Sequence, residues 1–172
     1  LKRDVLHADE TTLQVLQEPE KAPHCESYMW LYRTSGDTDK PIVLYEYQPG
    51  RGAKHPEAFL KGFKGYLHTD GYAGYHNLPD EITVVGCWAH ARRKFDEAVK
   101  SLPKGKAKGS SASRGLAYCN LLFAIEQGLS EKNATEKERY DQRLEQAKPV
   151  LDAFLAWANA RTAAPKSALG KA

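Results

Sequence analysis

The first half of the chain alternates short runs of branched and aromatic residues with clusters of turn-forming residues. Three such runs, at 4–8, 28–34 and 42–48, predict β-strands, because these side chains suit a pleated surface. The segment between the second and third runs, Ser35 to Pro41, consists mostly of turn formers. A loop of this length predicts that the two flanking strands pair antiparallel.

The pattern then changes to helices between strands. A short helix is predicted after Pro56, because Phe59, Leu60 and Phe63 form an apolar face. Runs at 66–70 and 82–86 predict two further strands. Apolar residues at helical spacing predict a helix over 88–101. The first 102 residues therefore predict an α/β core with five strands.

A different composition begins at residue 103. The stretch 103–113 contains mainly Lys, Gly, Ser and Ala, which predicts a flexible basic linker. The segment 114–162 is strongly helical and predicts a helical hairpin, with Pro149 kinking or splitting its second helix. Residues 163–172 are expected to form a frayed tail.

Length and composition narrow the class of protein. The 172 residues fit one domain with an appended subdomain, and the content of 41% hydrophobic and 27% charged residues is typical of folded globular proteins. No apolar run approaches the roughly 18 residues that cross a bilayer, so we expect no membrane partner. Three widely spaced cysteines without a signal peptide favour a cytoplasmic protein over a disulfide framework. The chain starts at Leu1 without a methionine, so we expect a piece of a longer protein.

Two aspartates follow predicted strands, Asp9 after 5–8 and Asp70 after 66–69. If these strands are adjacent and parallel, both carboxylates lie at one edge of the sheet, where oxygen ligands hold cations such as Mg²⁺. Two such ions, about 3.5–4 Å apart, can promote displacement at a phosphodiester. The alternative is that the aspartates only cap turns or helices, and the pattern by itself favours this alternative.

Three histidines are candidates for supporting roles. His7 and His68 each precede one aspartate by two residues, which puts each on the same face of the strand as that aspartate. Ligation of zinc or manganese is one hypothesis, but a hydrogen bond that orients the carboxylate is the stronger one. Cys87 and His90 have the spacing of half a zinc site, without a clear second half. We expect His90 instead to contact a metal-bound water or a phosphate from the first turn of its helix.

Net charge says little about partners, because a value of +3 neither indicates nor excludes DNA. Five basic residues are nevertheless candidates for contacts along a DNA backbone: Arg51, Lys54, Arg92, Arg93 and Lys94. The alternative for those on the helix is a solvated side, on which Arg93 pairs with Glu97. The sequence favours neither interpretation. Tyr72 and Tyr75 are expected to pack the turn after Asp70 rather than stack on bases.

Three motifs carry a family resemblance. They are HADET at 7–11, TDGYAGY at 69–75 and GCWAHARRKF at 86–95. With these motifs and their spacing, the sequence resembles the bacterial insertion-sequence transposases of the IS-sixty-six family. The resemblance implies a ribonuclease H-like fold: a mixed five-stranded sheet, three antiparallel strands and then parallel ones, flanked by helices and followed by a helical hairpin insertion.

The resemblance also implies a DDE active site that uses Mg²⁺ or Mn²⁺, in which Asp9 and Asp70 match the first two carboxylates. The third, a glutamate on a helix after the insertion, matches no residue of this chain. The implied activity is hydrolysis and strand transfer at transposon ends by a homo-oligomer associated with the nucleoid, and this fragment is expected to be inactive alone. Two alternatives stay open: a ribonuclease H-like nuclease without strand transfer, and a non-catalytic DNA-binding remnant of a decayed mobile element.

Overall fold

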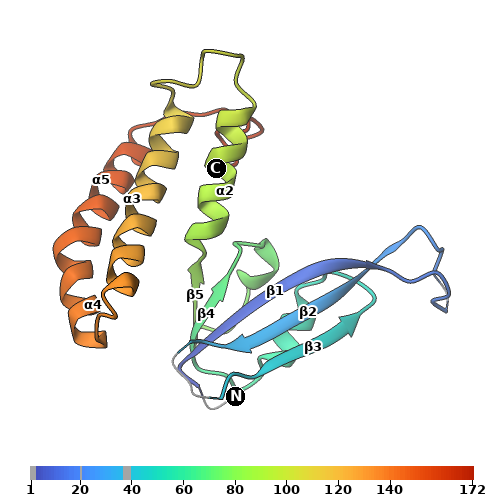
Figure 1. Cartoon of the computed structure of the whole chain (residues 1–172). Helices are drawn as coiled ribbons and strands as arrows, with labels where there is room; N and C mark the ends of the chain where they lie inside the picture. The colour runs from blue at the N-terminus through green and yellow to red at the C-terminus, as the bar shows by residue number, and fades with distance from the viewer. Residues whose placement is uncertain (1–2, 20, 37–39) are drawn as a thin grey trace. The chain divides into compact units, whose positions relative to one another are not determined.

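The computed structural model describes residues 3–19, 21–36 and 40–172, and the chain divides into two compact units, Leu1–Cys87 and Trp88–Ala172. The first unit contains a β-sheet and the second contains helices (Figure 1). The boundary falls after Cys87, whereas the sequence predicts a core that extends to residue 102. The helix that begins at Trp88 packs against the helix that follows it, which is why it belongs to the second unit.

The first unit is built on one mixed sheet with the strand order β3-β2-β1-β4-β5. The first three strands pair antiparallel, β4 pairs parallel to β1, and β5 pairs parallel to β4. This confirms the predicted five-stranded mixed sheet of α/β class, although residues 37–39 of the predicted β2–β3 loop lie outside the described residues. The strands are β1 (Val5–Gln14), β2 (Glu26–Thr34), β3 (Val43–Gln48), β4 (Gly65–Thr69) and β5 (Ile82–Gly86).

The first strand is longer than predicted. The sequence predicts a strand that ends just before Asp9, but β1 continues to Gln14, so Asp9 lies in the middle of a strand. The second half of β1 keeps its antiparallel pairing with β2, from Asp9 opposite Leu31 to Gln14 opposite Glu26. This pairing with a long neighbouring strand outweighs the polar composition of residues 9–14.

The core of the first unit lies on one face of this sheet. Alternate residues of β1, β2 and β4 point to it, and α1 (Lys54–Phe59) with the turn that follows covers it. The rings of Tyr32 and Phe59 stack there with their centroids 3.6 Å apart. The buried core residues are Leu6, Ala8, Trp30, Tyr32, Leu60, Phe63, Leu67, Tyr75 and Ile82.

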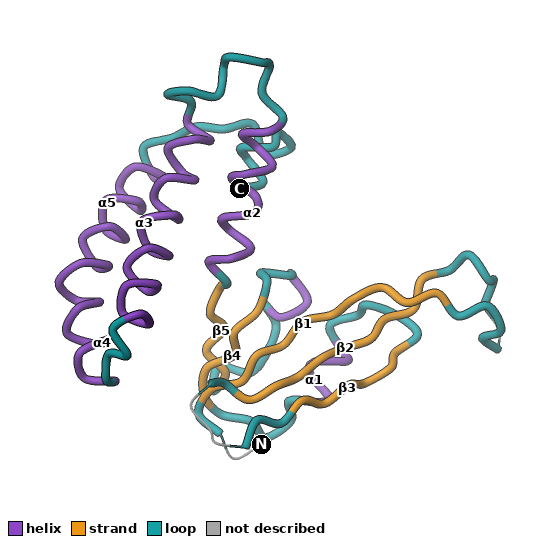
Figure 2. Tube along the Cα trace, in the orientation of Figure 1, coloured by secondary structure: helices purple, strands orange, loops and turns teal. Residues whose placement is uncertain are grey.

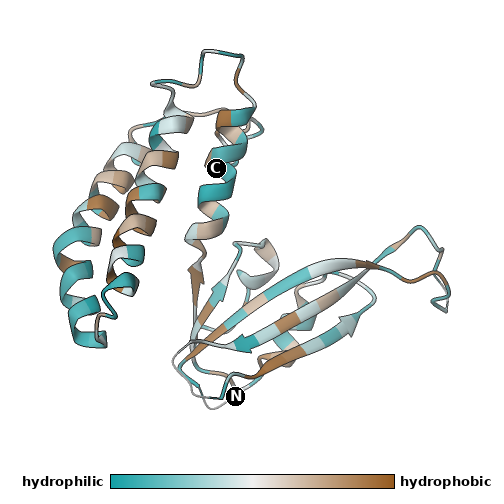
Figure 3. Ribbon diagram, viewed as in Figure 1, coloured by the Kyte–Doolittle hydropathy of each residue, from teal (hydrophilic) through white to brown (hydrophobic). Residues whose placement is uncertain are grey.

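The other face, which we call the Asp9 face, is more polar and more exposed. In one row across three strands, Asp9 lies opposite Leu31, and Leu31 lies opposite Tyr45. Asp9 and Tyr45 are exposed and Leu31 is half-buried. Hydrophobic residues gather along β5 and at the start of β3, whereas β1 has a mixed pattern (Figure 3).

The second unit consists of helices joined by loops (Figure 2). These helices pack around aromatic side chains. Its buried centre is formed by Phe95, Cys119 and Trp157, and the ring of Phe154 meets Phe95 edge-on at 6.1 Å. No helix in the described part of the chain is both long and apolar enough to cross a membrane. The helices are α2 (Trp88–Lys100), α3 (Ser111–Glu131), α4 (Glu136–Gln142), the π-helical segment η2 (Arg143–Ala147) and α5 (Lys148–Asn159).

The predicted split of the last helix at Pro149 is confirmed. Pro149 lies in the first turn of α5, directly after the π-helical segment η2. Proline has no N–H group to continue the α-helical hydrogen bonds, so a change of helix geometry just before it is expected.

Two boundaries of the second unit differ from the expected ones. Helix α3 begins at Ser111, inside the predicted linker, because the Ser110 hydroxyl caps it by accepting a hydrogen bond from the Ser113 N–H at 3.1 Å. The predicted frayed tail instead packs on the helical core through Leu169 and Ala172. The first difference reflects a local cap and the second a tertiary contact, and the composition of these segments reveals neither.

Two glycines of α3 provide a test of the helical packing. A Cβ atom at Gly115 would lie 2.2 Å from the buried Phe95 ring, whereas one at Gly128 would have no heavy atom within 4 Å. Gly115→Ala should therefore lower the free energy of unfolding by about 1–3 kcal/mol. Gly128→Ala should raise it by about 0.5–1 kcal/mol, because alanine favours the helix. Urea denaturation followed by helical circular dichroism measures both, and effects of equal sign would contradict the close approach of α2 and α3.

Candidate active site

The two aspartates lie on neighbouring parallel strands. His7 of β1 pairs with His68 of β4, and Asp9 and Asp70 each lie two residues further in the same direction. Within β1, a side chain two residues on returns to the same face, so Asp9 shares the Asp9 face with His7. Asp70 directly follows the last residue of β4, so the ladder ends two residues before each aspartate.

A tight turn sets the orientation of Asp70, the first residue after β4. The Tyr72 N–H donates a hydrogen bond to Asp70 Oδ1 at 2.8 Å. Between them, Gly71 has a φ of +88°, a conformation that suits glycine. The short helix η1 (Ala73–Tyr75) follows directly. The turn therefore presents Asp70 at the end of the strand with one oxygen already oriented by the backbone.

The carboxylates keep capacity for a cation. Asp9 is exposed and Asp70 is half-buried, and Asp9 Oδ1 accepts a hydrogen bond from the N–H of its own neighbour Glu10 at 2.9 Å. Within the described ranges, neither aspartate forms a salt bridge. Since Mg²⁺ and Mn²⁺ prefer carboxylate oxygens together with water, this donor set fits such an ion.

The structure brings the two histidines together. The rings of His7 and His68 have centroids 4.7 Å apart with a tilt of 46°, and both side chains are half-buried. Over residues 3–19, 21–36 and 40–172, no group of three or more His, Cys, Asp or Glu side chains is arranged to hold a metal ion. The zinc hypotheses for the histidines thus gain no support, and the orienting role of His7 and His68 stays a prediction.

Glu10 is a residue of the site that the sequence analysis missed. It follows Asp9 on β1, points to the core face, and its side chain is fully buried. Glu10 Oε1 accepts hydrogen bonds from Arg51 Nε at 2.8 Å and from Arg51 Nη2 at 2.6 Å, while Oε2 accepts one from the Tyr75 hydroxyl at 2.9 Å. Burial raises the pKa of Glu10, and the hydrogen bonds from Arg51 and Tyr75 oppose that rise.

A signal for Glu10 was present in the sequence. Leu6 and Ala8 are apolar and precede Glu10 with the period of a strand, which puts all three on one face. An acid in phase with a buried apolar face predicts a buried carboxylate that needs partners. The identity of those partners could not be predicted, because Arg51 is 41 residues away in the sequence.

Arg51 is engaged inside the first unit. Besides its contact with Glu10, its guanidinium carbon lies 3.9 Å from the centroid of the Tyr72 ring, and the Tyr72 hydroxyl donates a hydrogen bond to the Arg51 carbonyl. The Arg51 side chain is 42% exposed, so its predicted contact with DNA competes with these internal contacts. Lys54 begins α1 and forms no salt bridge in the described part of the chain; its DNA contact stays a prediction.

His90 and Arg92 lie on α2 in the second unit. His90 Nδ1 is buried and has no hydrogen-bond partner among the residues that the structure describes. Arg92 Nε donates a hydrogen bond to Asn120 Oδ1 on α3 at 2.7 Å, which holds the arginine against the neighbouring helix. The predicted contacts of His90 with a metal-bound water or phosphate, and of Arg92 with DNA, stay predictions.

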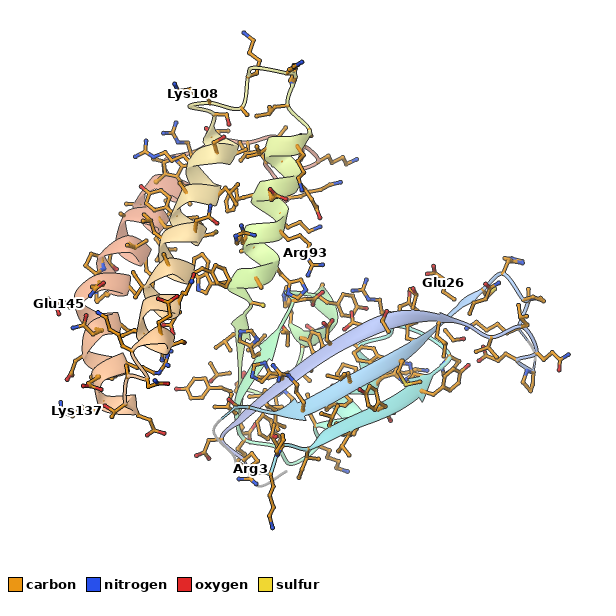
Figure 4. All side chains as sticks on the ribbon, in the orientation of Figure 1. Arg3, Glu26, Arg93, Lys108, Lys137 and Glu145 are labelled. Atoms are coloured by element: carbon orange, nitrogen blue, oxygen red, sulfur yellow. The ribbon has the colours of Figure 1, made fainter. Side chains whose placement is uncertain are left out.

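The neighbouring basic residues of α2 bear on the alternative of a solvated helix side. Glu97 pairs with Lys94 at 3.4 Å, and the described residues show no salt bridge between Arg93 and Glu97. Spacings of three and four residues both bring helical side chains together, and the sequence does not choose between them. Arg93 is exposed and points away from α3 (Figure 4). The predicted DNA contacts of Arg93 and Lys94 also stay predictions.

Two buried tyrosines test whether the hydrogen bond to Glu10 stabilises the site. The Tyr75 hydroxyl donates to Glu10, whereas the buried Tyr32 hydroxyl has no hydrogen-bond partner within the described residues. Tyr75→Phe should lower the free energy of unfolding by about 1–3 kcal/mol, because it leaves the buried carboxylate with one donor fewer. Tyr32→Phe should change it by less than about 0.5 kcal/mol. Chemical denaturation measures both values, and equal losses would refute the specific role of the Tyr75 hydroxyl.

Comparison with known proteins gives relatives but no structural counterpart. A Sinorhizobium fredii protein described as uncharacterized protein y4qI is 41% identical over 101 residues, which cover 51% of this chain and 19% of that protein. A second protein of the same organism, uncharacterized protein y4hP, is 31% identical over 169 residues, covering 88% of this chain and 30% of that protein. The chain thus spans less than a third of the length of either relative. No solved structure matches it.

The family comparison is broader. The model of the family described as "Transposase IS66 family" matches residues 1–172, the whole chain, and therefore includes the segments with Asp9, Asp70 and the α2 motif. The chain belongs to the IS66 transposase family.

Proposed function

We propose that this chain forms part of the ribonuclease H-like catalytic core of a DDE transposase, with Asp9 and Asp70 as two of its three catalytic carboxylates. The observation that carries this proposal is the parallel pairing of β1 with β4, in which His7 lies opposite His68. This pairing supports the proposal because each histidine precedes its aspartate by two residues, so the two aspartates follow neighbouring ends of one parallel ladder. The strand order, with three antiparallel strands followed by two parallel ones, agrees with this fold.

The proposed chemistry needs the two carboxylates as a pair. Negative charges held close together repel each other, so the site is predisposed to take up a cation. Asp9 and Asp70 would hold Mg²⁺ or Mn²⁺, which activates a water or hydroxyl group and stabilises charge on the reacting phosphate when bound. The residues of the chain would contribute position: the Tyr72 N–H donates a hydrogen bond to Asp70, and the β1–β4 ladder ends two residues before each aspartate.

The proposed partners are the transposon ends and the target DNA, contacted by exposed basic side chains such as Lys54, Arg93 and Lys94. We assign the third carboxylate to no residue of this chain. Two carboxylates without a third donor make an incomplete site, so we expect the isolated chain to be weak or inactive, and to act in a homo-oligomer as part of the longer protein.

Metal binding by the isolated chain tests the carboxylate pair. Asp9→Asn and Asp70→Asn should each abolish the Mn²⁺ binding that isothermal titration calorimetry detects for the unsubstituted chain, because each removes a charged ligand. Asp80→Asn is the matched control, since Asp80 is exposed and precedes β5 at the opposite end of that strand from Gly86. Binding that persists in both variants would remove the aspartates from the site and favour a non-catalytic DNA-binding role.

DNA cleavage by the longer protein that contains this segment tests the activity itself. Metal-dependent nicking of a transposon end should be lost in Asp70→Asn and retained in Asp80→Asn. Joining of the freed 3′-hydroxyl to target DNA would distinguish a transposase from a nuclease without strand transfer. Cleavage that survives Asp70→Asn would rule out Asp70 as a catalytic residue.

A further inference from the structure

Asp9 and Glu10 are neighbours on β1 that point to opposite faces of the sheet. Asp9 lies on the exposed face, whereas Glu10 lies on the core face with its side chain fully buried. We propose that Glu10 and Arg51 form a positioning pair that couples the strand of Asp9 to the turn of Asp70. This inference rests on the proposed function, because it assigns the pair to the alignment of the two carboxylates.

The buried end of this coupling is Glu10. A carboxylate without solvent is costly unless charged or hydrogen-bonding partners surround it. Glu10 has two such partners, both distant in the sequence: Arg51 on the loop before α1, and Tyr75 at the end of η1. Any movement of β1 at this position therefore disturbs contacts with both segments.

The second link runs from Arg51 to the turn after β4. The Arg51 guanidinium stacks on the Tyr72 ring, and the Tyr72 hydroxyl holds the Arg51 backbone carbonyl. The same arginine thus binds an acid on one side and an aromatic face on another, a combination that the planar guanidinium allows and a lysine ammonium does not reproduce. Arg51 connects β1 to Tyr72 through contacts of two kinds.

The third link joins Tyr72 to Asp70. The Tyr72 N–H donates to Asp70 Oδ1, and the Tyr72 ring meets the buried Tyr75 ring edge-on, with centroids 6.0 Å apart. Gly74 leaves space for the Tyr72 ring, because a Cβ atom at this position would lie 2.3 Å from Tyr72 Cε1. The Tyr72 side chain is thus clamped on several sides while its backbone orients Asp70.

Together these contacts form a continuous path from Asp9 to Asp70. The path passes through Glu10, Arg51 and Tyr72. The charge of Asp70 also acts on Glu10: burial is the largest cause of the raised Glu10 pKa, and the Asp70 charge is a further, smaller one. Since the aspartates repel each other, a scaffold that resists their separation lowers the cost of holding them for a cation.

The test uses the 172-residue chain and the variant Arg51→Gln, which keeps the aliphatic stem and a polar end but removes the charge and the planar fork. Two measurements are made: the rate of hydrogen–deuterium exchange in the peptide 69–76, and the affinity for Mn²⁺ by calorimetry. We expect faster exchange in 69–76 by about 10-fold, as the turn opens locally. We also expect a Mn²⁺ affinity about 10-fold weaker, the size of effect that loss of an orienting contact has at other metal sites.

Two further variants separate positioning from general stability. Arg51→Lys keeps the charge opposite Glu10 and should restore part of the affinity and part of the protection. Ile82→Ala removes a buried side chain at the start of β5 and should destabilise the same unit without changing either quantity at Asp70. If Ile82→Ala reproduces the effects of Arg51→Gln, the role of Arg51 is structural only and the inference is overturned.

The outcomes also distinguish this inference from the proposed function. If the unsubstituted chain binds Mn²⁺ through Asp9 and Asp70, but Arg51→Gln changes neither exchange nor affinity, the positioning pair is refuted and the function stands. If the aspartates bind no Mn²⁺, the proposed function fails, and the exchange of 69–76 still decides whether Arg51 holds the turn. Unchanged exchange in that case overturns the positioning pair as well.

Discussion

The short parallel ladder between β1 and β4 is the constraint on which the candidate site depends. It consists of three residue pairs, Val5 with Tyr66, Leu6 with Leu67, and His7 with His68. A slip of one residue would turn every side chain of β4 to the other face and separate the aspartates. The register is held by burial, because Leu6 and Leu67 face each other in the core with 5% and 0% exposure. The buried pair of Leu6 and Leu67 thus fixes the register of His7 opposite His68.

The site combines an exposed acid with a buried one on adjacent residues of one strand. Asp9 is exposed to solvent, whereas Glu10 is held by Arg51 and Tyr75 in the interior. Burying a carboxylate destabilises the fold unless its partners are well placed, so the contacts of Glu10 with Arg51 and Tyr75 offset the cost of its burial. In this sheet the buried acid ties β1 to the loop before α1 and to the turn that carries Asp70. The side chains of Glu10, Arg51 and Tyr75 therefore contribute both to the stability of the first unit and to the geometry of the candidate site.

The helical unit is organised by aromatic rings and small residues rather than by charge. Phe95, Phe154 and Trp157 meet at angles from 41° to 90°, and Gly115 allows α3 to approach the ring of Phe95. Its ion pairs, such as Lys94 with Glu97, lie at the surface and contribute little to stability. Arg92 is held by a hydrogen bond to Asn120. The other basic residues of α2 form few internal contacts that would compete with binding to a polyanion.

The sequence by itself determined the features that depend on local periodicity. The five strands, the helix from Trp88, the split at Pro149 and the shared face of His7 and Asp9 follow from spacing within one segment. Tertiary structure alone decided that β1 runs past Asp9 to Gln14, because that extension depends on pairing with β2. It also decided that Glu10 meets Arg51 across 41 residues, and that the tail packs on the helical core. Contacts between distant segments form only where the fold brings both partners together. The residue spacing within one segment does not predict which other segment it will contact.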